Sequence, residues 1–223
     1  MSTENEYIEF IQKVAQYEKN WWLADLVYLQ AVKCLDDVRK DLTTLNKDHV
    51  DEIIMPFLVT WGQMARSISQ VEEKDWNGLV EKLRKQKSNL DHLNKWKLLD
   101  ITFDNETKEA IKSLYGAVQV KYVGPTSVSK ILHLLAPEVL PIWDDQLRGK
   151  RPKGYEVKAT PEGYVKYMEK MQEIAVKFFP HGADQVIQDI SKHLTQGREE
   201  ILEAKTVAKL IDEFVWTKCH EKG

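Results

Sequence analysis

Cysteine is almost absent from this chain, since only Cys34 and Cys219 occur in 223 residues. Two thiols form no disulfide framework and cannot supply the four ligands of an iron–sulfur cluster. The six histidines are scattered, and the sequence contains neither an HExxH nor a CxxC motif. We therefore expect no metal centre and no cofactor. A reducing compartment is the simplest location, either the cytoplasm or, in a eukaryote, the nucleus.

Long apolar runs are lacking as well. The first residues, MSTENEYIEF, have neither the basic nor the apolar region of a signal peptide, and no run approaches the length of a membrane span. We therefore predict no association with a membrane. The net charge of −3 excludes a general attraction to nucleic acid. Binding to nucleic acid would need a local basic patch.

Alternating strand patterns are scarce, whereas apolar residues recur at helical spacing along almost the whole chain. We predict an all-α protein of roughly ten helices, too many for a simple four-helix bundle. Hydrophobic residues make up 43% of the chain, which is enough for a substantial core. The predicted helices cover residues 5–18, 20–42, 48–70 with a kink or break at Pro56, a short segment capped by Asp75, 88–99, 105–120, a segment from about Thr126, 160–178, 183–194 and 198–219.

A glycine–proline turn, Gly124-Pro125, separates helix 105–120 from the next helix. Glycine can take a positive φ, and proline suits the first turn of a helix. The backbone N–H groups of such a turn and of the following helix form a concavity that favours an anion such as phosphate. Lys121 and Lys130 would add positive charge. An ordinary connection between two helices has the same local pattern.

The segment VKYVGPTSV, residues 120–128, resembles the helix–hairpin–helix element of the HhH-GPD DNA glycosylases, which reads apolar-Pro-Gly-apolar-Gly-Pro. Val123, Gly124 and Pro125 match, while Tyr122 stands at the first hairpin glycine and Lys121 at the proline before it. Those enzymes continue with a second hairpin helix, a short loop and a Pro-x-Asp-Thr-His-Val-Arg-like segment that carries an essential aspartate. LPIWDDQLR, residues 140–148, is similar, with one extra residue between its proline and Asp144.

This resemblance implies a monofunctional DNA glycosylase that hydrolyses the N-glycosidic bond of a damaged or mismatched base. Asp144 would be the catalytic carboxylate, which stabilises positive charge on the sugar and orients a water molecule. Trp143 and Tyr122 are the candidates for contacting the flipped base. The lysine of bifunctional members corresponds to Thr126, whose hydroxyl cannot form a Schiff base. Lyase chemistry would therefore have to use another lysine, Lys130 or Lys121.

The resemblance also implies contacts with DNA phosphates and a division into two lobes. Residues 121–158 carry a net charge of +3, with seven Lys or Arg against four Asp or Glu. Residues about 25–120, including the start of the hairpin, would form one lobe, and the N-terminal helix with residues 121–223 the other. The predicted phosphate contacts are Lys121, Val123, Gly124, Thr126, Lys130, Arg148, Lys150 and Arg151.

Structural alternatives stand beside each of these predictions. Asp144 or Asp145 could cap a short helix, with Trp143 as packing, and the basic loop after them could be plain solvated surface. The protein would then be a non-catalytic helical module that binds nucleic acid, a protein or a small ligand. Four other tryptophans are predicted to fill the core between helices. They are Trp21, Trp22, Trp61 and Trp216.

Overall fold

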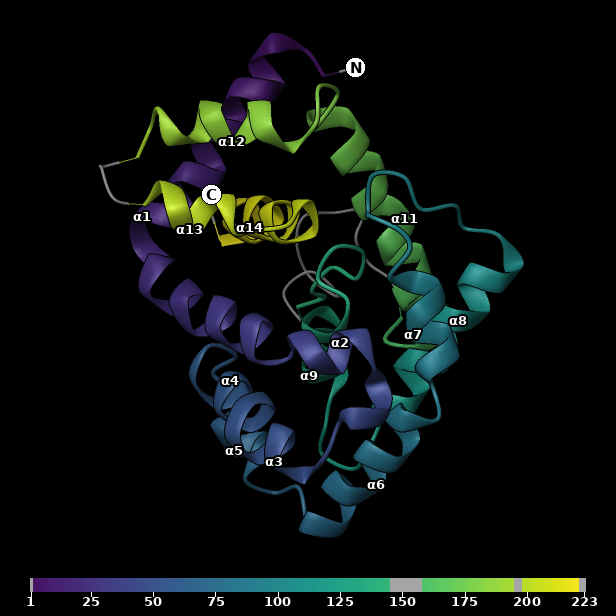
Figure 1. Cartoon of the computed structure of the whole chain (residues 1–223). Coiled ribbons are helices and arrows are strands. Elements are labelled where there is room, and N and C mark those ends of the chain that lie inside the picture. The colour runs from purple at the N-terminus through teal and green to yellow at the C-terminus, as the bar shows by residue number, and fades with distance from the viewer. Residues whose placement is uncertain (1, 145–157, 195–197, 221–223) are drawn as a thin grey trace.

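The computed structural model describes residues 2–144, 158–194 and 198–220, and these residues contain helices and no strands (Figure 1). The all-α class predicted from the periodicity is therefore confirmed. Within the same ranges, none of the helices combines the length and the apolar composition that a membrane span requires.

The chain begins with one long helix, α1 (Glu4–Cys34), where the sequence predicted two. A capping box starts it: Glu6 N–H donates to Thr3 Oγ1 at 3.3 Å, and Thr3 N–H donates to Glu6 Oε2 at 2.9 Å. The helix continues past the predicted gap because neither proline nor glycine interrupts it. It ends at Leu35, after which the short helix α2 (Asp36–Lys40) and a 3₁₀ turn (Leu42–Thr44) follow.

Pro56 accompanies a change of helix type in the next helical region and does not split it, because the helical conformation runs on from Lys47 to Thr60. Proline has no N–H to donate to the preceding turn, and a wide π-helical turn lies directly before it. The region is interrupted at Trp61–Met64, where Gln63 has a positive φ of 52°. The resulting elements are α3 (Lys47–His49), the π turn (Val50–Ile54), α4 (Met55–Thr60) and α5 (Ala65–Ile68).

The middle of the chain holds α6 (Glu73–Arg84), α7 (Lys87–Leu93) and α8 (Asn105–Val118). Asp104 caps α8, since its carboxylate accepts a hydrogen bond from Thr107 N–H at 2.8 Å. The predicted cap at Asp75 is wrong, because α6 begins two residues earlier and Glu72 takes the cap position. Asp75 instead lies in the first turn of the helix, where a negative carboxylate interacts favourably with the helix dipole.

The hairpin between α8 and α9 (Pro125–Leu135) differs from its prediction in one respect. Gly124 has an ordinary φ of −75°, while Tyr122 takes the left-handed conformation with φ of 67°. A side chain in that conformation costs about 1–2 kcal/mol. Pro125 occupies the first turn of α9, as predicted.

The last helices are α11 (Pro161–Phe178), α12 (Ala183–Ser191), α13 (Glu199–Glu203) and α14 (Val207–His220). The predicted helix 198–219 is therefore split near Lys205. The break is stabilised by Thr206, whose hydroxyl donates to Pro137 C=O at 2.7 Å and accepts from Lys209 N–H at 3.2 Å.

Helix α9 lies at the centre of the molecule (Figure 1). All of its residues after Pro125 are buried, and it contacts α8 and α1. Helix α1 also packs against α14, α12 and α13, while α8 packs against α6, α7 and α11. The division of the chain into two lobes stays a prediction. Helix α9 is the second helix of the hairpin. It and the segment after it therefore lie where several helices meet.

Candidate functional site

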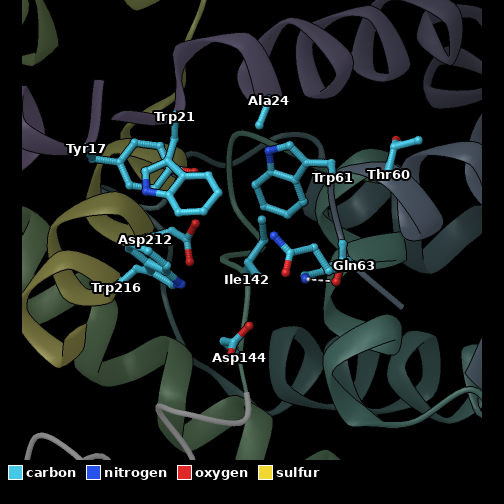
Figure 2. A pocket seen from close by; sticks show the side chains of 12 residues that line it. Tyr17, Trp21, Ala24, Thr60, Trp61, Gln63, Ile142, Asp144, Asp212 and Trp216 are labelled. Carbon is cyan, nitrogen blue, oxygen red and sulfur yellow. Dashed lines mark hydrogen bonds between the residues drawn. The ribbon is translucent and has the colours of Figure 1, made fainter. Parts of the chain in front are cut away.

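A pocket of about 270 Å³ opens where α1, the α4–α5 connection, α9 and α14 meet (Figure 2). Aromatic rings and polar groups share its lining. The polar groups come from the hairpin helix, from the segment after it and from α14. The aromatic residues that line the pocket are Tyr17, Trp21, Trp61 and Trp216.

The aromatic residues make an ordered set of ring contacts. The ring of Trp216 meets the rings of Tyr17 and Trp21 edge to face, with centroids 5.6 and 5.4 Å apart. Trp61 stacks on Phe57 at 5.1 Å, and its indole N–H donates to Asp25 at 3.3 Å. These contacts hold flat apolar surfaces open to the pocket. Such surfaces suit a planar ligand ring.

The prediction that these tryptophans fill the core holds only in part, because Trp61 packs against the core but also lines the pocket. Trp21 is 36% exposed, and Trp61 and Trp216 are half-buried at the pocket. Trp22 is also half-buried, with the Arg198 guanidinium 5.3 Å from its ring centroid. Their helical spacing indicated a buried face, but a face that borders a cavity has the same spacing.

Asp144 lies at the border between this pocket and a second hollow of about 540 Å³. It is half-buried and is the last described residue of the irregular segment that follows α9. The second hollow has a polar lining that includes Arg66, Thr126 and Lys130. Asp144 therefore faces an aromatic cavity on one side and a polar one on the other.

Side chains from two helices fix the segment that carries Asp144. Trp143 N–H donates to Ser129 Oγ of α9 at 2.9 Å. The hydroxyl of Tyr164 donates to Pro141 C=O, and that of Tyr167 donates to Ile142 C=O, each at 2.7 Å. The segment belongs to no helix or strand, so these bonds satisfy its backbone and set the position of the next residue, Asp144.

The side chain of Trp143 points away from the pocket into the core. It is 0% exposed, and its ring packs against Tyr115, Tyr164 and Tyr167 with centroids 6.3, 5.8 and 5.6 Å apart. The predicted contact between Trp143 and a flipped base does not fit this position, because a buried ring offers no face to a ligand. Trp143 instead supports the segment before Asp144.

Lys130 enters the site from α9, one turn after Thr126. Its side chain is buried, and its ammonium donates to Gly62 C=O at 3.3 Å. The same ammonium lies 5.0 Å from the ring centroid of Trp61. Lys130 lines both hollows, as Asp144 does. One positive and one negative side chain therefore lie where the two hollows meet.

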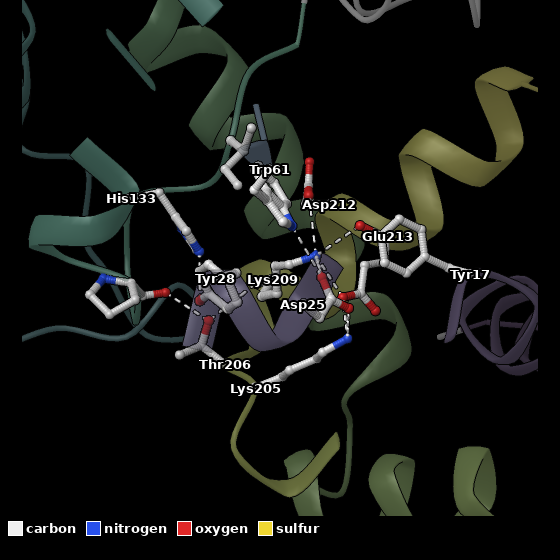
Figure 3. Close-up of polar contacts among 12 residues, drawn as sticks. Tyr17, Asp25, Tyr28, Trp61, His133, Lys205, Thr206, Lys209, Asp212 and Glu213 are labelled. Atoms are coloured by element: carbon white, nitrogen blue, oxygen red, sulfur yellow. Dashed lines mark hydrogen bonds and ion pairs between the residues drawn. The ribbon is translucent and has the colours of Figure 1, made fainter. Parts of the chain in front are cut away.

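Next to the pocket, and sharing Asp212 with it, a buried cluster of charged side chains joins α1 to α14 (Figure 3). The Lys205 ammonium contacts Glu18, Asp25 and Glu213, all with side chains fully buried. The Lys209 ammonium lies 2.6 Å from Glu213 and 3.5 Å from Asp25. Burial works against charge here, but these carboxylates raise the pKa of Lys209 well above its ordinary value.

One group in the cluster resembles a metal site. Oxygens of Glu18, Asp25 and Glu213 lie within 4.8 Å of one another. The Lys205 ammonium already contacts all three, however, and supplies the positive charge that an ion would bring. We therefore assign this group a structural role.

Asp212 is the carboxylate of this cluster that reaches the pocket. Its nearest cation is the Lys209 ammonium at 3.8 Å, farther than the partners of Asp25 and Glu213. Lys205 contacts three carboxylates, and Asp212 is a fourth, next to Lys209. The ammonium groups of Lys205 and Lys209 therefore lie among four carboxylates. Burial is the main cause that raises the pKa of Asp212 from 3.8 to about 7, and Asp144 adds to the rise.

The remaining predicted site residues lie in different places, some at the hairpin and some outside the described ranges. Tyr122 is 44% exposed at the hairpin and lines neither hollow, with the Lys121 ammonium 4.8 Å from its ring centroid. The side chain of Val123 is buried, so only its backbone could face a phosphate. Gly124 begins α9. The predicted residues outside the described ranges are Asp145, Arg148, Lys150 and Arg151.

The sequence did not point to Asp212, Gln63 or Arg66. A signal for Asp212 existed, since the segment AKLIDEFVW places three charged residues within an apolar helix. Charged residues in that setting are rarely buried unless they pair. For Gln63 and Arg66 the sequence offers no comparable signal, because their position depends on the break between α4 and α5.

No protein-family model matches this chain, and neither a curated protein nor a solved structure matches it. The description of this protein therefore rests on its own structure. The protein is all-helical in its described part, with an aromatic pocket that two carboxylates and a buried lysine border.

Proposed function

We propose that this protein is a DNA glycosylase-like enzyme of the HhH-GPD kind, which hydrolyses the N-glycosidic bond of a damaged or mismatched base with Asp144 as the catalytic carboxylate. The position of Asp144 carries the proposal. It lies between a cavity with flat aromatic walls and a polar hollow beside the hairpin helix.

The two hollows match the parts of a nucleotide. A base turned out of its stack would lie in the aromatic pocket, where Trp21 and Trp216 offer ring surfaces. The phosphates would lie in the polar hollow, where Arg66 and Lys130 supply positive charge. The sugar would then pass the border between them, next to Asp144.

Hydrolysis of an N-glycosidic bond requires a carboxylate next to the sugar, at that border. Breaking the bond between sugar and base builds positive charge on the sugar, which an adjacent carboxylate stabilises. The same carboxylate can orient a water molecule toward C1′. Thr126 lines the polar hollow and has no amine, so we propose hydrolysis rather than Schiff-base chemistry at that position.

The backbone of the hairpin supports the resemblance to these enzymes. Tyr122 stands where the family has its first hairpin glycine, and its φ of 67° is the conformation that glycine adopts easily. Pro125 occupies the first turn of the following helix, as the motif requires.

A non-catalytic binding module is the second candidate, and the hairpin also provides its support. The side chain of Tyr122 is exposed at a position where the family has none. This bulk leaves less space for a phosphate against the backbone. The aromatic pocket would then bind a nucleotide or another planar ligand without cleaving it.

The test is a panel of duplex and single-stranded oligonucleotides, each with one damaged or mismatched base, scored for abasic sites after alkali treatment. We expect Asp144→Asn to keep binding while excision falls by about 10²–10³-fold, since removing one electrostatic group at the reacting centre has effects of this size. Asp145→Asn is the matched control, because it removes a carboxylate at the next position in the sequence, outside the described residues.

Two results would contradict the proposal. Equal excision by wild type and Asp144→Asn, on any substrate that wild type cleaves, would remove Asp144 from catalysis. If wild type cleaves nothing in the panel, the binding module becomes the better description, and oligonucleotide affinity would then be the quantity to measure.

A further inference from the structure

Asp212 is a second carboxylate in the aromatic pocket, and it comes from a different element than Asp144. It lies on α14 beside Tyr17 and Trp216, whereas Asp144 lies at the end of the segment after α9 (Figure 2). The residue is only 4% exposed. Two carboxylates in one cavity, one half-buried and one buried, have different environments and can take different protonation states.

The charges around Asp212 come from three helices and from the segment after α9. The Lys209 ammonium is 3.8 Å away, but Glu213 and Asp25 both lie closer to it. The pKa of Asp212 is raised to about 7, mainly by burial, so near neutral pH much of the protein carries a protonated Asp212. The titratable groups around it are Tyr17 and Asp25 of α1, Lys130 of α9, Asp144, and Lys209 and Cys219 of α14.

We propose that Asp212 is the proton donor to the departing base and that the substrate is a neutral purine. The inference rests on the proposed function and names the substrate class of the same site. A purine attached through N9 keeps free ring nitrogens that accept a proton. Uracil, attached through N1, has no free ring nitrogen of this kind. An acid placed against the base is therefore useful for a purine.

The step balances without an oxidant or a reductant. The bond between C1′ and N9 breaks, and its electron pair stays on the base while the proton of Asp212 moves to a ring nitrogen. A water oxygen bonds to C1′ on the side of Asp144 and loses a proton to solvent. Asp212 then takes up a proton from solvent. The products are an abasic sugar and a neutral free base.

The experiment compares two purines that differ in their need for a proton. Duplexes would carry hypoxanthine, which is neutral, or 7-methylguanine, which is already cationic and leaves without protonation. We expect Asp212→Asn to reduce hypoxanthine excision by about 10²-fold or more, the usual contribution of a positioned acid. Excision of 7-methylguanine should change by less than about threefold. Asp144→Asn should reduce the excision of both, because both pass through a sugar cation.

A second measurement keeps the test decisive if Asp212→Asn does not fold. Wild-type excision of hypoxanthine should fall as pH rises above about 7, as Asp212 loses its proton. Excision of 7-methylguanine should lack this falling limb. A residue with a purely structural role would affect both substrates alike and would give both the same pH profile.

The outcomes separate the two proposals. If wild type excises no base, the function and this inference fail together. If Asp144→Asn is inactive but Asp212→Asn excises hypoxanthine at the wild-type rate, only the inference fails. It also fails if Asp212→Asn loses both substrates equally, if the two wild-type pH profiles coincide, or if wild type excises 7-methylguanine and not hypoxanthine.

Discussion

Asp212 links the stability of the protein to pH, whatever its role in catalysis. Its carboxyl titrates at about 7 in the folded protein and at its ordinary value of 3.8 when unfolded. The folded state therefore holds the extra proton between these values. The stability that this proton provides is complete below about pH 4 and is lost as pH rises through about 7.

Asp212→Asn should reveal this loss, because asparagine keeps the shape of the protonated side chain. Relative to wild type, the variant should gain stability between pH 5 and pH 8 by on the order of 2–3 kcal/mol, at about 1.36 kcal/mol per pKa unit. Urea unfolding at both pH values would measure it. A difference between variant and wild type that is independent of pH would show that Asp212 is ionised throughout.

At the scale of single residues, the sequence predicts a site residue when a local motif carries it. Asp144 could be proposed from its place after the hairpin, and it borders both hollows. Trp143 and Trp61 could not be assigned in the same way. Both are tryptophans on apolar segments, but the first is buried among tyrosines and the second lines the pocket. Tertiary packing makes that difference.

At the scale of helices, Lys205 lies at the junction between α13 and α14 and contacts carboxylates of α1. We expect Lys205→Ala to lower the free energy of unfolding by about 3–5 kcal/mol, because it leaves buried carboxylates without their cation. Lys218→Ala is the matched control. Lys218 also joins α14 to α1, at 3.2 Å from Glu9, but the pair is exposed and should contribute less than about 1 kcal/mol.

Chemical unfolding of wild type and both variants at one pH would test this. Similar small losses in the two variants would mean that the buried cluster adds nothing beyond a surface pair. A loss confined to Lys205→Ala would assign the docking of α1 on α14 to the buried charges.

Helix boundaries were predictable where one residue decides them. Asp104 caps α8, and Pro125 occupies the first turn of α9. Boundaries that depend on other helices were not predictable. The break near Lys205 exists because Thr206 bonds to Pro137, a residue 69 positions away in the sequence. No local pattern contains that contact.

At the scale of the whole molecule, binding to DNA has to overcome a net charge of −3. Positive charge is useful only where it is concentrated, and Arg66 and Lys130 are concentrated in the polar hollow beside Asp144. We therefore expect weak affinity for duplex DNA that falls steeply with salt, since each phosphate contact releases counterions. Lys150 and Arg151, which lie outside the described residues, are expected from the sequence to add to it.

Reversing one charge in the hollow should separate this patch from the rest of the surface. Arg66→Glu should weaken binding to all sequences alike and reduce the slope of log affinity against log salt by about one. Lys192→Glu is the control, because Lys192 is exposed next to the end of α12, at the opposite end of the molecule from α5 (Figure 1). Fluorescence anisotropy with an undamaged duplex at several salt concentrations would measure both variants. Equal affinities and slopes for Arg66→Glu and wild type would mean that DNA phosphates do not enter the polar hollow. The base and the sugar would then have to reach Asp144 without the support of that hollow, and the match between the two hollows and a nucleotide would no longer hold.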